Sequence, residues 1–153
     1  MKLKSLAAIL ALAISNAAFA ADTSSPSSRS DPAMDRYQAA AERQDWKSAA
    51  DAMREALDRD VLNADYHNLY AYSLRRSGSG DMDQVFKHYN EALRLDPKHR
   101  GAHEYIGEAY LMVGNVAKAK EHLSALDKMC FFGCSEYDAL KKAIADYDAK
   151  VVK

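Results

Sequence analysis

The fold is decided by residues 100–126, RGAHEYIGEAYLMVGNVAKAKEHLSAL. Apolar side chains recur at helical spacing on both sides of a break at Gly114 and Asn115. Glycine and asparagine are residues at which helices commonly end, because both tolerate the left-handed backbone conformation. The stretch therefore predicts two amphipathic helices joined by a tight turn, which is an antiparallel helical hairpin.

Gly107 lies in the middle of the first of these helices. A glycine inside a helix costs about 1 kcal/mol relative to alanine. Its presence indicates that another helix approaches the backbone closely at this point. The small residue Ala119, on the return helix, is the expected neighbour.

The chain repeats this hairpin. The break at Gly114 follows Gly78 by 36 residues, and Gly78 follows Gln44 by 34. The same spacing recurs on the second helices at Ala56, Ala92 and Leu126. The two extra residues fall in the turn that begins at Gly78, where the sequence is rich in glycine and serine. Three hairpins in phase indicate a stacked array.

The third hairpin resembles a tetratricopeptide repeat, which runs L-G-x-x-Y and then A-x-x-x-F over a period of 34 residues. Here the corresponding residues are Ile106, Gly107, Tyr110, Ala119 and Leu123. The resemblance implies an all-α fold, a solenoid of three helical hairpins with a C-terminal capping helix. The repeats are expected at about 32–63, 64–99 and 100–133 and the capping helix at about 135–149, in one domain at 32–150.

Residues 1–20, MKLKSLAAILALAISNAAFA, have the features of a secretory signal peptide. Two lysines precede a short apolar run, and the run ends in a small-x-small cleavage site at Ala20. We expect export to the periplasm, with secretion as the alternative. Residues 21–31 are rich in serine and are expected to form a flexible linker. No later segment is apolar enough to cross a bilayer.

The charge of the chain argues against nucleic acid as a partner. Removing the leader lowers the basic side chains from 21 to 19, because Lys2 and Lys4 are lost, against 22 acidic ones. A mildly acidic chain has no broad electrostatic attraction for nucleic acid or anionic lipid.

In proteins of the repeat family, the first helices of the hairpins line a concave face, and the resemblance places ten residues of this chain there. Such a mixture of aromatic, apolar and charged side chains suits an extended peptide of another protein, here one of the bacterial envelope. Some family members clamp a C-terminal carboxylate, but Gly101 and Tyr105 stand where that clamp needs basic residues. The expected peptide-binding residues are Asp65, Asn68, Tyr72, Arg75, Arg76, Glu104, Tyr105, Glu108, Leu111 and Met112.

Cys130 and Cys134 are the two cysteines of the chain. In an exported protein, a close pair is most simply a disulfide, which would fix the angle between the last repeat and the capping helix. Two alternatives stay open, a thiol-redox centre and a copper site with soft sulfur ligands. Measuring free thiol in the exported protein distinguishes them.

The histidines and acids do not form a recognised catalytic or metal motif. His99 and His103 are four residues apart, but the sequence offers no third ligand nearby. His67 and His103 hold equivalent places in two repeats, which indicates a packing role. The sequence therefore predicts a binding scaffold or adaptor with no cofactor, no metal and no enzymatic activity, and the thiol or copper function is the alternative.

Overall fold

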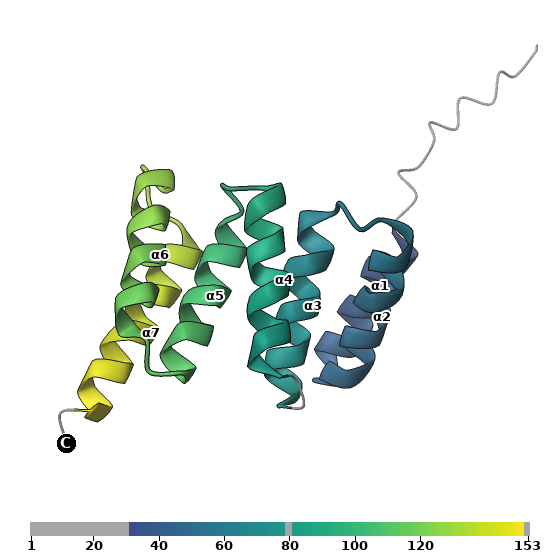
Figure 1. The fold of residues 1–153 in the computed structure, drawn as a ribbon, viewed down its shortest axis with the longest axis horizontal. Coiled ribbons are helices and arrows are strands. Elements are labelled where there is room, and N and C mark those ends of the chain that lie inside the picture. Colours follow the sequence, from purple (N-terminus) through teal and green to yellow (C-terminus); the bar gives the residue numbers. More distant parts are fainter. Residues whose placement is uncertain (1–30, 79–80, 152–153) are drawn as a thin grey trace, which may run out of the picture.

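The computed structural model describes residues 31–78 and 81–151. Seven α-helices account for nearly all of this part of the chain, which confirms the predicted all-α class (Figure 1). In order they are α1 (Pro32–Glu42), α2 (Trp46–Arg59), α3 (Ala64–Ser77), α4 (Met82–Leu95), α5 (Arg100–Met112), α6 (Val116–Met129) and α7 (Ser135–Val151). The predicted signal peptide and residues 21–30 of the predicted linker lie outside the described residues.

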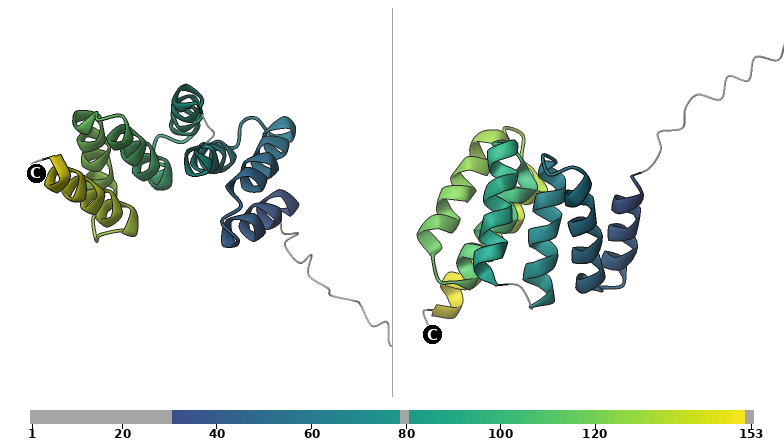
Figure 2. Two further views of the ribbon diagram at one scale, coloured as in Figure 1. Left: turned by 90° about the horizontal axis from the view of Figure 1, so that it is seen from below. Right: turned by 45° about the vertical axis from the view of Figure 1, so that its right-hand side comes forward.

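The helices form three antiparallel hairpins, α1–α2, α3–α4 and α5–α6, and α7 packs on α5 and α6. Seen from below, the hairpins follow an arc, with α1, α3, α5 and α7 on its inner side and α2, α4 and α6 on its outer side (Figure 2). We call the surface formed by α1, α3, α5 and α7 the concave face. The arrangement is the predicted hairpin solenoid with a capping helix.

The turn inside each hairpin needs a left-handed residue. Gln44, Gly78 and Gly114 have φ angles of 56°, 66° and 75°, and these are the three breaks whose spacing revealed the repeats. Glycine adopts this conformation without a steric cost, whereas Gln44 does so at a cost of about 1 kcal/mol. The repeat pattern therefore reflects one backbone requirement that is met three times.

Most helices begin with a side chain that accepts a hydrogen bond from a free backbone N–H of the first turn. Asp45, Asn63 and Asn115 cap α2, α3 and α6 in this way, and His99 caps α5 through Nδ1. These caps explain why the helices begin where they do. His99 therefore precedes α5 and caps it, whereas His103 lies in the first turn of the helix.

The close approach at Gly107 involves a different helix from the one expected. A Cβ atom at Gly107 would lie 2.6 Å from Cδ2 and 2.7 Å from Cδ1 of Leu140, on α7. Ala119 is buried in the same hydrophobic cluster as Leu140, but it is not among the atoms nearest to Gly107. The close approach of another helix is therefore confirmed, but the nearest side chain belongs to the capping helix and not to the return helix.

The corner between α6 and α7 is closed by a disulfide between Cys130 and Cys134, whose Cα atoms are 5.5 Å apart. A bridge over so short a loop stabilises the fold by about 2 kcal/mol in the chain-entropy estimate. Helix α6 ends at Met129, ahead of Gly133, and Ser135 is the first residue of α7, with its hydroxyl bonded to Glu136.

None of the helices in the described residues is both long enough and apolar enough to cross a lipid bilayer.

Candidate functional site: the concave face

The predicted binding residues lie along the seam between α3 and α5. Along this seam, Asp65 meets His99, with 3.0 Å between Oδ1 and Nε2, and Asn68 lies beside Gly101. Asp65 and Asn68 are among the residues that the resemblance placed on this face, whereas His99 and Gly101 are not. The structure adds that several of them contact each other instead of facing an open surface.

Asn68 is buried, with an exposed fraction of 4%. Its Nδ2 atom lies 3.4 Å from the point where a Cβ would stand on Gly101, and its Oδ1 atom has no hydrogen-bond partner among the described residues. A buried acceptor without a donor costs about 1–3 kcal/mol. Because the side chain is covered by α5, a ligand can reach this oxygen only if the seam opens.

An aromatic cluster occupies the middle of the concave face. The rings of Tyr72 and Tyr105 have centroids 4.6 Å apart, and Trp46 packs edge-on to Tyr72 at 5.5 Å. The guanidinium of Arg76 lies 4.7 Å from the centre of the Trp46 ring and donates a hydrogen bond to the Tyr72 hydroxyl at 3.2 Å. Trp46 is the first residue of α2, so the first hairpin contributes to this cluster.

The side chain of Arg75 is occupied by contacts within the protein. Its side chain is only 8% exposed, and it forms an ion pair with Glu108 at 2.6 Å. It also donates to the hydroxyl of Tyr89 at 3.4 Å and approaches the sulfur of Met112 at 3.9 Å. Removing one partner of such a pair strands a buried charge and costs about 3–5 kcal/mol. Replacing Arg75 or Glu108 would therefore test folding and binding together, so neither residue is a clean probe of the site.

Glu104 is the unpaired carboxyl of the face. Burial, and then the neighbouring carboxylates of Glu108 and Glu136, raise its pKa from 4.5 to about 7. It forms no hydrogen bond or ion pair with the described residues, although it is only half-exposed. Beside it, burial raises the pKa of Tyr105 to about 12, with a smaller contribution from the Glu104 charge. The face thus holds a partly buried carboxyl group without a cationic partner of its own.

We expect Glu104→Gln to raise the free energy of unfolding by about 1 kcal/mol near pH 8 and to leave it unchanged near pH 4. The pKa of Glu104 is raised in the folded chain, so its ionisation opposes folding increasingly as pH rises from 4.5 to about 7. The full shift corresponds to about 3 kcal/mol, which solvent screening of a half-exposed group reduces. Chemical denaturation at the two pH values measures the effect. Glu121→Gln, on the exposed side of α6, is the control, and an equal gain at both pH values for Glu104→Gln would contradict the interpretation.

Two hollows flank the closed centre of the concave face. One, of about 270 Å³, includes Asp65, and another, of about 430 Å³, includes Leu111 and Met112. Leu111 is 7% exposed and packs against α7, whereas Met112 is 60% exposed. The first hollow is lined by Asp65, Asp96, Lys98, His99, Arg100, Gly101 and Glu136, and the second by Leu111, Met112, Ala143, Asp146, Tyr147 and Lys150.

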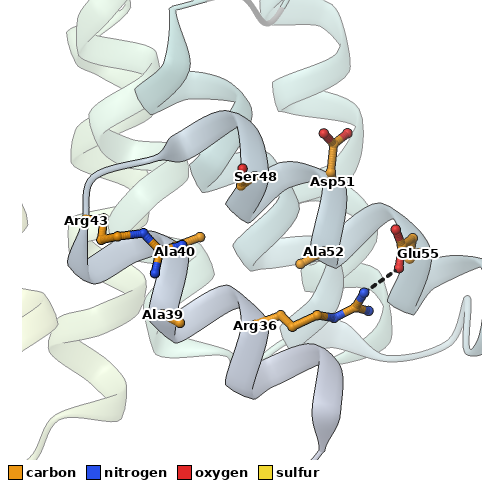
Figure 3. A pocket seen from close by; sticks show the side chains of 8 residues that line it. All are labelled: Arg36, Ala39, Ala40, Arg43, Ser48, Asp51, Ala52 and Glu55. Carbon is orange, nitrogen blue, oxygen red and sulfur yellow. Dashed lines mark hydrogen bonds and ion pairs between the residues drawn. The ribbon is translucent and has the colours of Figure 1, made fainter.

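A third hollow, of about 300 Å³, lies between α1 and α2 (Figure 3). Its floor is formed by the small side chains of Ala40 and Ala52, and its rim carries an ion pair between Arg36 and Glu55 at 2.7 Å. Both partners are about half-exposed, so the pair contributes little to stability. None of the predicted binding residues lies in this hollow.

Two histidine pairs occupy equivalent places in the second and third hairpins. The Nδ1 atoms of His67 and His88 are 2.8 Å apart, and His67 Nε2 lies 2.9 Å from the carbonyl oxygen of Val61. The second pair, His103 and His122, has 2.9 Å between its Nδ1 atoms and the same bond to a carbonyl of the preceding loop at 3.2 Å. This repetition confirms the packing role inferred for His67 and His103. The described residues contain no group of three or more potential metal ligands.

The sequence pattern missed three residues that shape the site. Tyr37 lies on α1, and its pKa is raised to about 12 by burial and by nearby Tyr72. Tyr89 holds Arg75 from the outer helix α4, and Glu136 contributes negative charge from α7. Tyr37 could have been found from the sequence, because it lies on the first helix of its hairpin, as the predicted residues of the other two hairpins do. The roles of Tyr89 and Glu136 depend on packing between helices that periodicity does not reveal.

The chain has no match among protein-family models and none among curated proteins. Solved structures do resemble it. The TPR domain of Sgt2 from Aspergillus fumigatus has a TM-score of 0.69 at 24% identity, over 83% of this chain and 82% of that one. The TPR2B domain of yeast Sti1, solved in complex with pHsp70, has a TM-score of 0.67 at 21% identity, over 77% of this chain and 94% of that one.

A third neighbour is SycD, the type III secretion translocator chaperone of Yersinia enterocolitica. Its TM-score is 0.63 at 15% identity, over 80% of this chain and 93% of that one. At these identities the likeness concerns the fold. With the three hairpins, the repeated left-handed turns and the capping helix, it establishes that this chain has the tetratricopeptide-repeat fold.

Proposed function

We propose that the protein is an interaction module that holds a segment of a partner protein against its concave face. The tetratricopeptide-repeat fold supports a binding role, since one structural neighbour was solved in complex with pHsp70 and another is a translocator chaperone. The proposed role is binding and not catalysis. Export to the periplasm, directed by residues 1–20, is part of the proposal and would place the partner in the cell envelope.

The observation that carries the proposal is the unpaired carboxyl of Glu104 beside the aromatic cluster. A lysine or arginine side chain of the partner would pair with this carboxylate and lie against the Tyr72 and Tyr105 rings. The arginines of the face are less suited to an acidic segment, because Arg75 is already paired with Glu108 and Arg76 lies on Trp46. The expected occupant is therefore a segment with a basic residue.

Site-specific photocrosslinking in the cell tests where the partner binds. A photoreactive residue at Met112, which is exposed on the concave face, should give a discrete adduct identifiable by mass spectrometry. The same residue at Arg94, exposed on the outer helix α4, is the matched control. Adducts of the same pattern from both positions would place the binding surface elsewhere.

Purified protein tests the charge of the occupant. Trp46 is the single tryptophan of the chain and lies in the aromatic cluster, so its fluorescence reports on the face. Peptides with a lysine or arginine should change the emission at lower concentration than matched peptides with glutamate. Glu104→Gln should reduce this preference without changing the fold, and a preference for glutamate peptides would contradict the proposal.

The alternative thiol or copper function receives no support from the arrangement of the sulfurs. Cys130 and Cys134 are joined to each other, and neither is a free thiol in the described structure. A thiolate is the form that binds copper or attacks a disulfide. Free-thiol measurement on the exported protein remains the direct test.

A further inference from the structure

The loop between α6 and α7 presents two phenylalanines to solvent. Phe131 is 90% exposed and Phe132 is 98% exposed, the highest values among the large apolar side chains of the described residues. Their rings contact each other edge-on with centroids 5.5 Å apart. The disulfide between Cys130 and Cys134 closes this loop and holds the two rings at its tip. Two adjacent aromatic side chains fixed in this way have no role in the core of the protein.

The tip lies on an edge of the array that carries further apolar residues. The loops α2–α3, α4–α5 and α6–α7 all lie along one edge, at the top of Figure 1. In the α2–α3 loop, Val61 and Leu62 are 60% and 67% exposed. A flat binding surface placed against this edge would therefore contact exposed apolar side chains in both the α2–α3 loop and the α6–α7 loop.

A basic hollow adjoins the tip. It has a volume of about 510 Å³ and is lined by Lys98, Arg100, Lys128 and Met129, with no carboxylate in its lining. Neither lysine has an ion-pair partner among the described residues, and the Arg100–Glu136 pair is loose at 3.8 Å. Two unpaired lysines beside two exposed phenyl rings match a ligand that is anionic at its surface and apolar beneath it.

Acidic residues lie near the hollow, and Glu136 pairs loosely with Arg100, but none of them lines it. The Asp96 carboxylate accepts the backbone N–H of Lys98 at 2.9 Å, so it is turned toward its own loop. Asp127 is exposed next to Lys128 and does not line the hollow. The local positive charge contrasts with the formal net charge of −1 of the whole chain.

The shape of the tip distinguishes between a protein and a membrane as its occupant. A stable protein interface buries about 800 Å² on each partner, whereas two phenyl rings offer about 300–500 Å². The tip is convex, so a protein would need a matching pocket, but lipid can surround it on all sides. We propose that this edge docks onto a membrane surface rich in acidic phospholipids, with Phe131 and Phe132 inserted among the lipids and Lys98, Arg100 and Lys128 at the headgroups.

Vesicle cosedimentation tests the proposal with the chain from Ala21 onward, which contains every described residue and lacks the apolar leader that would itself enter lipid. The chain should bind vesicles of phosphatidylethanolamine and phosphatidylglycerol more tightly than vesicles of phosphatidylcholine. The double variant Phe131→Ser, Phe132→Ser should raise the lipid concentration for half-binding by about tenfold or more. Lys98→Gln and Lys128→Gln should each raise it by about fivefold, the equivalent of about 1 kcal/mol per lysine.

Val113→Ser is the matched control, because Val113 is 50% exposed but lies at the turn on the opposite edge. Its binding should equal that of the parent chain. All variants should keep the melting temperature of the parent, since the replaced side chains are exposed. The proposal is overturned if the parent chain stays in the supernatant with phosphatidylglycerol vesicles, or if the phenylalanine variant binds them as well as the parent. It is also overturned if that variant instead abolishes self-association measured by light scattering, because the tip would then be a protein contact.

Discussion

Replacing Gly107 by leucine should lower the free energy of unfolding by about 3 kcal/mol or more. Even a single Cβ at this position would stand 2.6 Å from a methyl carbon of Leu140. Leu140 is fully buried in a cluster with Leu126 and Ile144, so it has no free space into which it can move. The expected structural result is displacement of α7 from α5. Urea denaturation measures the loss of stability, and hydrogen exchange in α7 shows where it occurs.

Gly101 provides the matched control in the same helix. A Cβ there would lie 3.4 Å from Nδ2 of Asn68, an ordinary contact distance. Because alanine favours helix over glycine, Gly101→Ala should leave the stability unchanged or raise it by about 0.5–1 kcal/mol. Equal losses for Gly107→Leu and Gly101→Ala would show that the helix tolerates no added side chain anywhere, and the specific contact with α7 would lose its support.

Lowering the pH from about 6.5 to about 4 should reduce the stability by about 3 kcal/mol in total through the two histidine pairs. Burial, and then the charge of the partner ring, lowers the pKa of His88 and of His122 from 6.5 to about 4. The folded chain therefore binds fewer protons than the unfolded chain within this range, and its stability is complete above the unfolded pKa and falls as pH decreases. The full shift of each ring corresponds to about 3 kcal/mol, and its partial exposure to solvent reduces this by about half.

The hydrogen bonds explain why protonation is unfavourable. The carbonyl oxygen of Val61 can only accept, so His67 donates from Nε2 and its Nδ1 must accept from Nδ1–H of His88. A first proton on His88 adds a charge in a half-buried position beside Lys87 and Glu91.

Denaturation curves across this pH range measure the effect. The double variant His88→Gln, His122→Gln retains a hydrogen-bond donor in each pair but does not titrate, so its profile should be flatter by the same amount. Glu104 changes stability in the opposite direction over part of the range, and it contributes equally to both proteins. If the variant and the parent lost stability in parallel, the histidine pairs would have no part in the dependence.

The repeat architecture could be predicted because it depends on local backbone requirements that recur along the chain. The left-handed turns at Gln44, Gly78 and Gly114 fixed the spacing, and the missing side chain at Gly107 indicated a close helix. The identity of that helix could not be predicted, because the repeat pattern ends before α7 begins. A position in a repeat predicts which way a side chain points but not what it meets.

The candidate site shows the same limit. The resemblance to the repeat family placed Tyr72, Arg75 and Glu108 on one face, but it could not show that Arg75 and Glu108 pair with each other or that Tyr72 meets Tyr105. These contacts depend on the distance between α3 and α5, which packing sets. The cysteine pair was predicted from its spacing, whereas the exposure of Phe131 and Phe132 follows from the geometry of the closed loop.

Each hairpin packs mainly on its neighbours along the chain, with α7 on the last of them. No helix is shared by the whole molecule, so no one contact holds every part in place. When its two ends are pulled apart, such a molecule is expected to unfold one hairpin at a time. Its end-to-end length would then increase in separate steps. A protein built in this way could unfold its hairpin at one end under force while the hairpins at the other end stay folded.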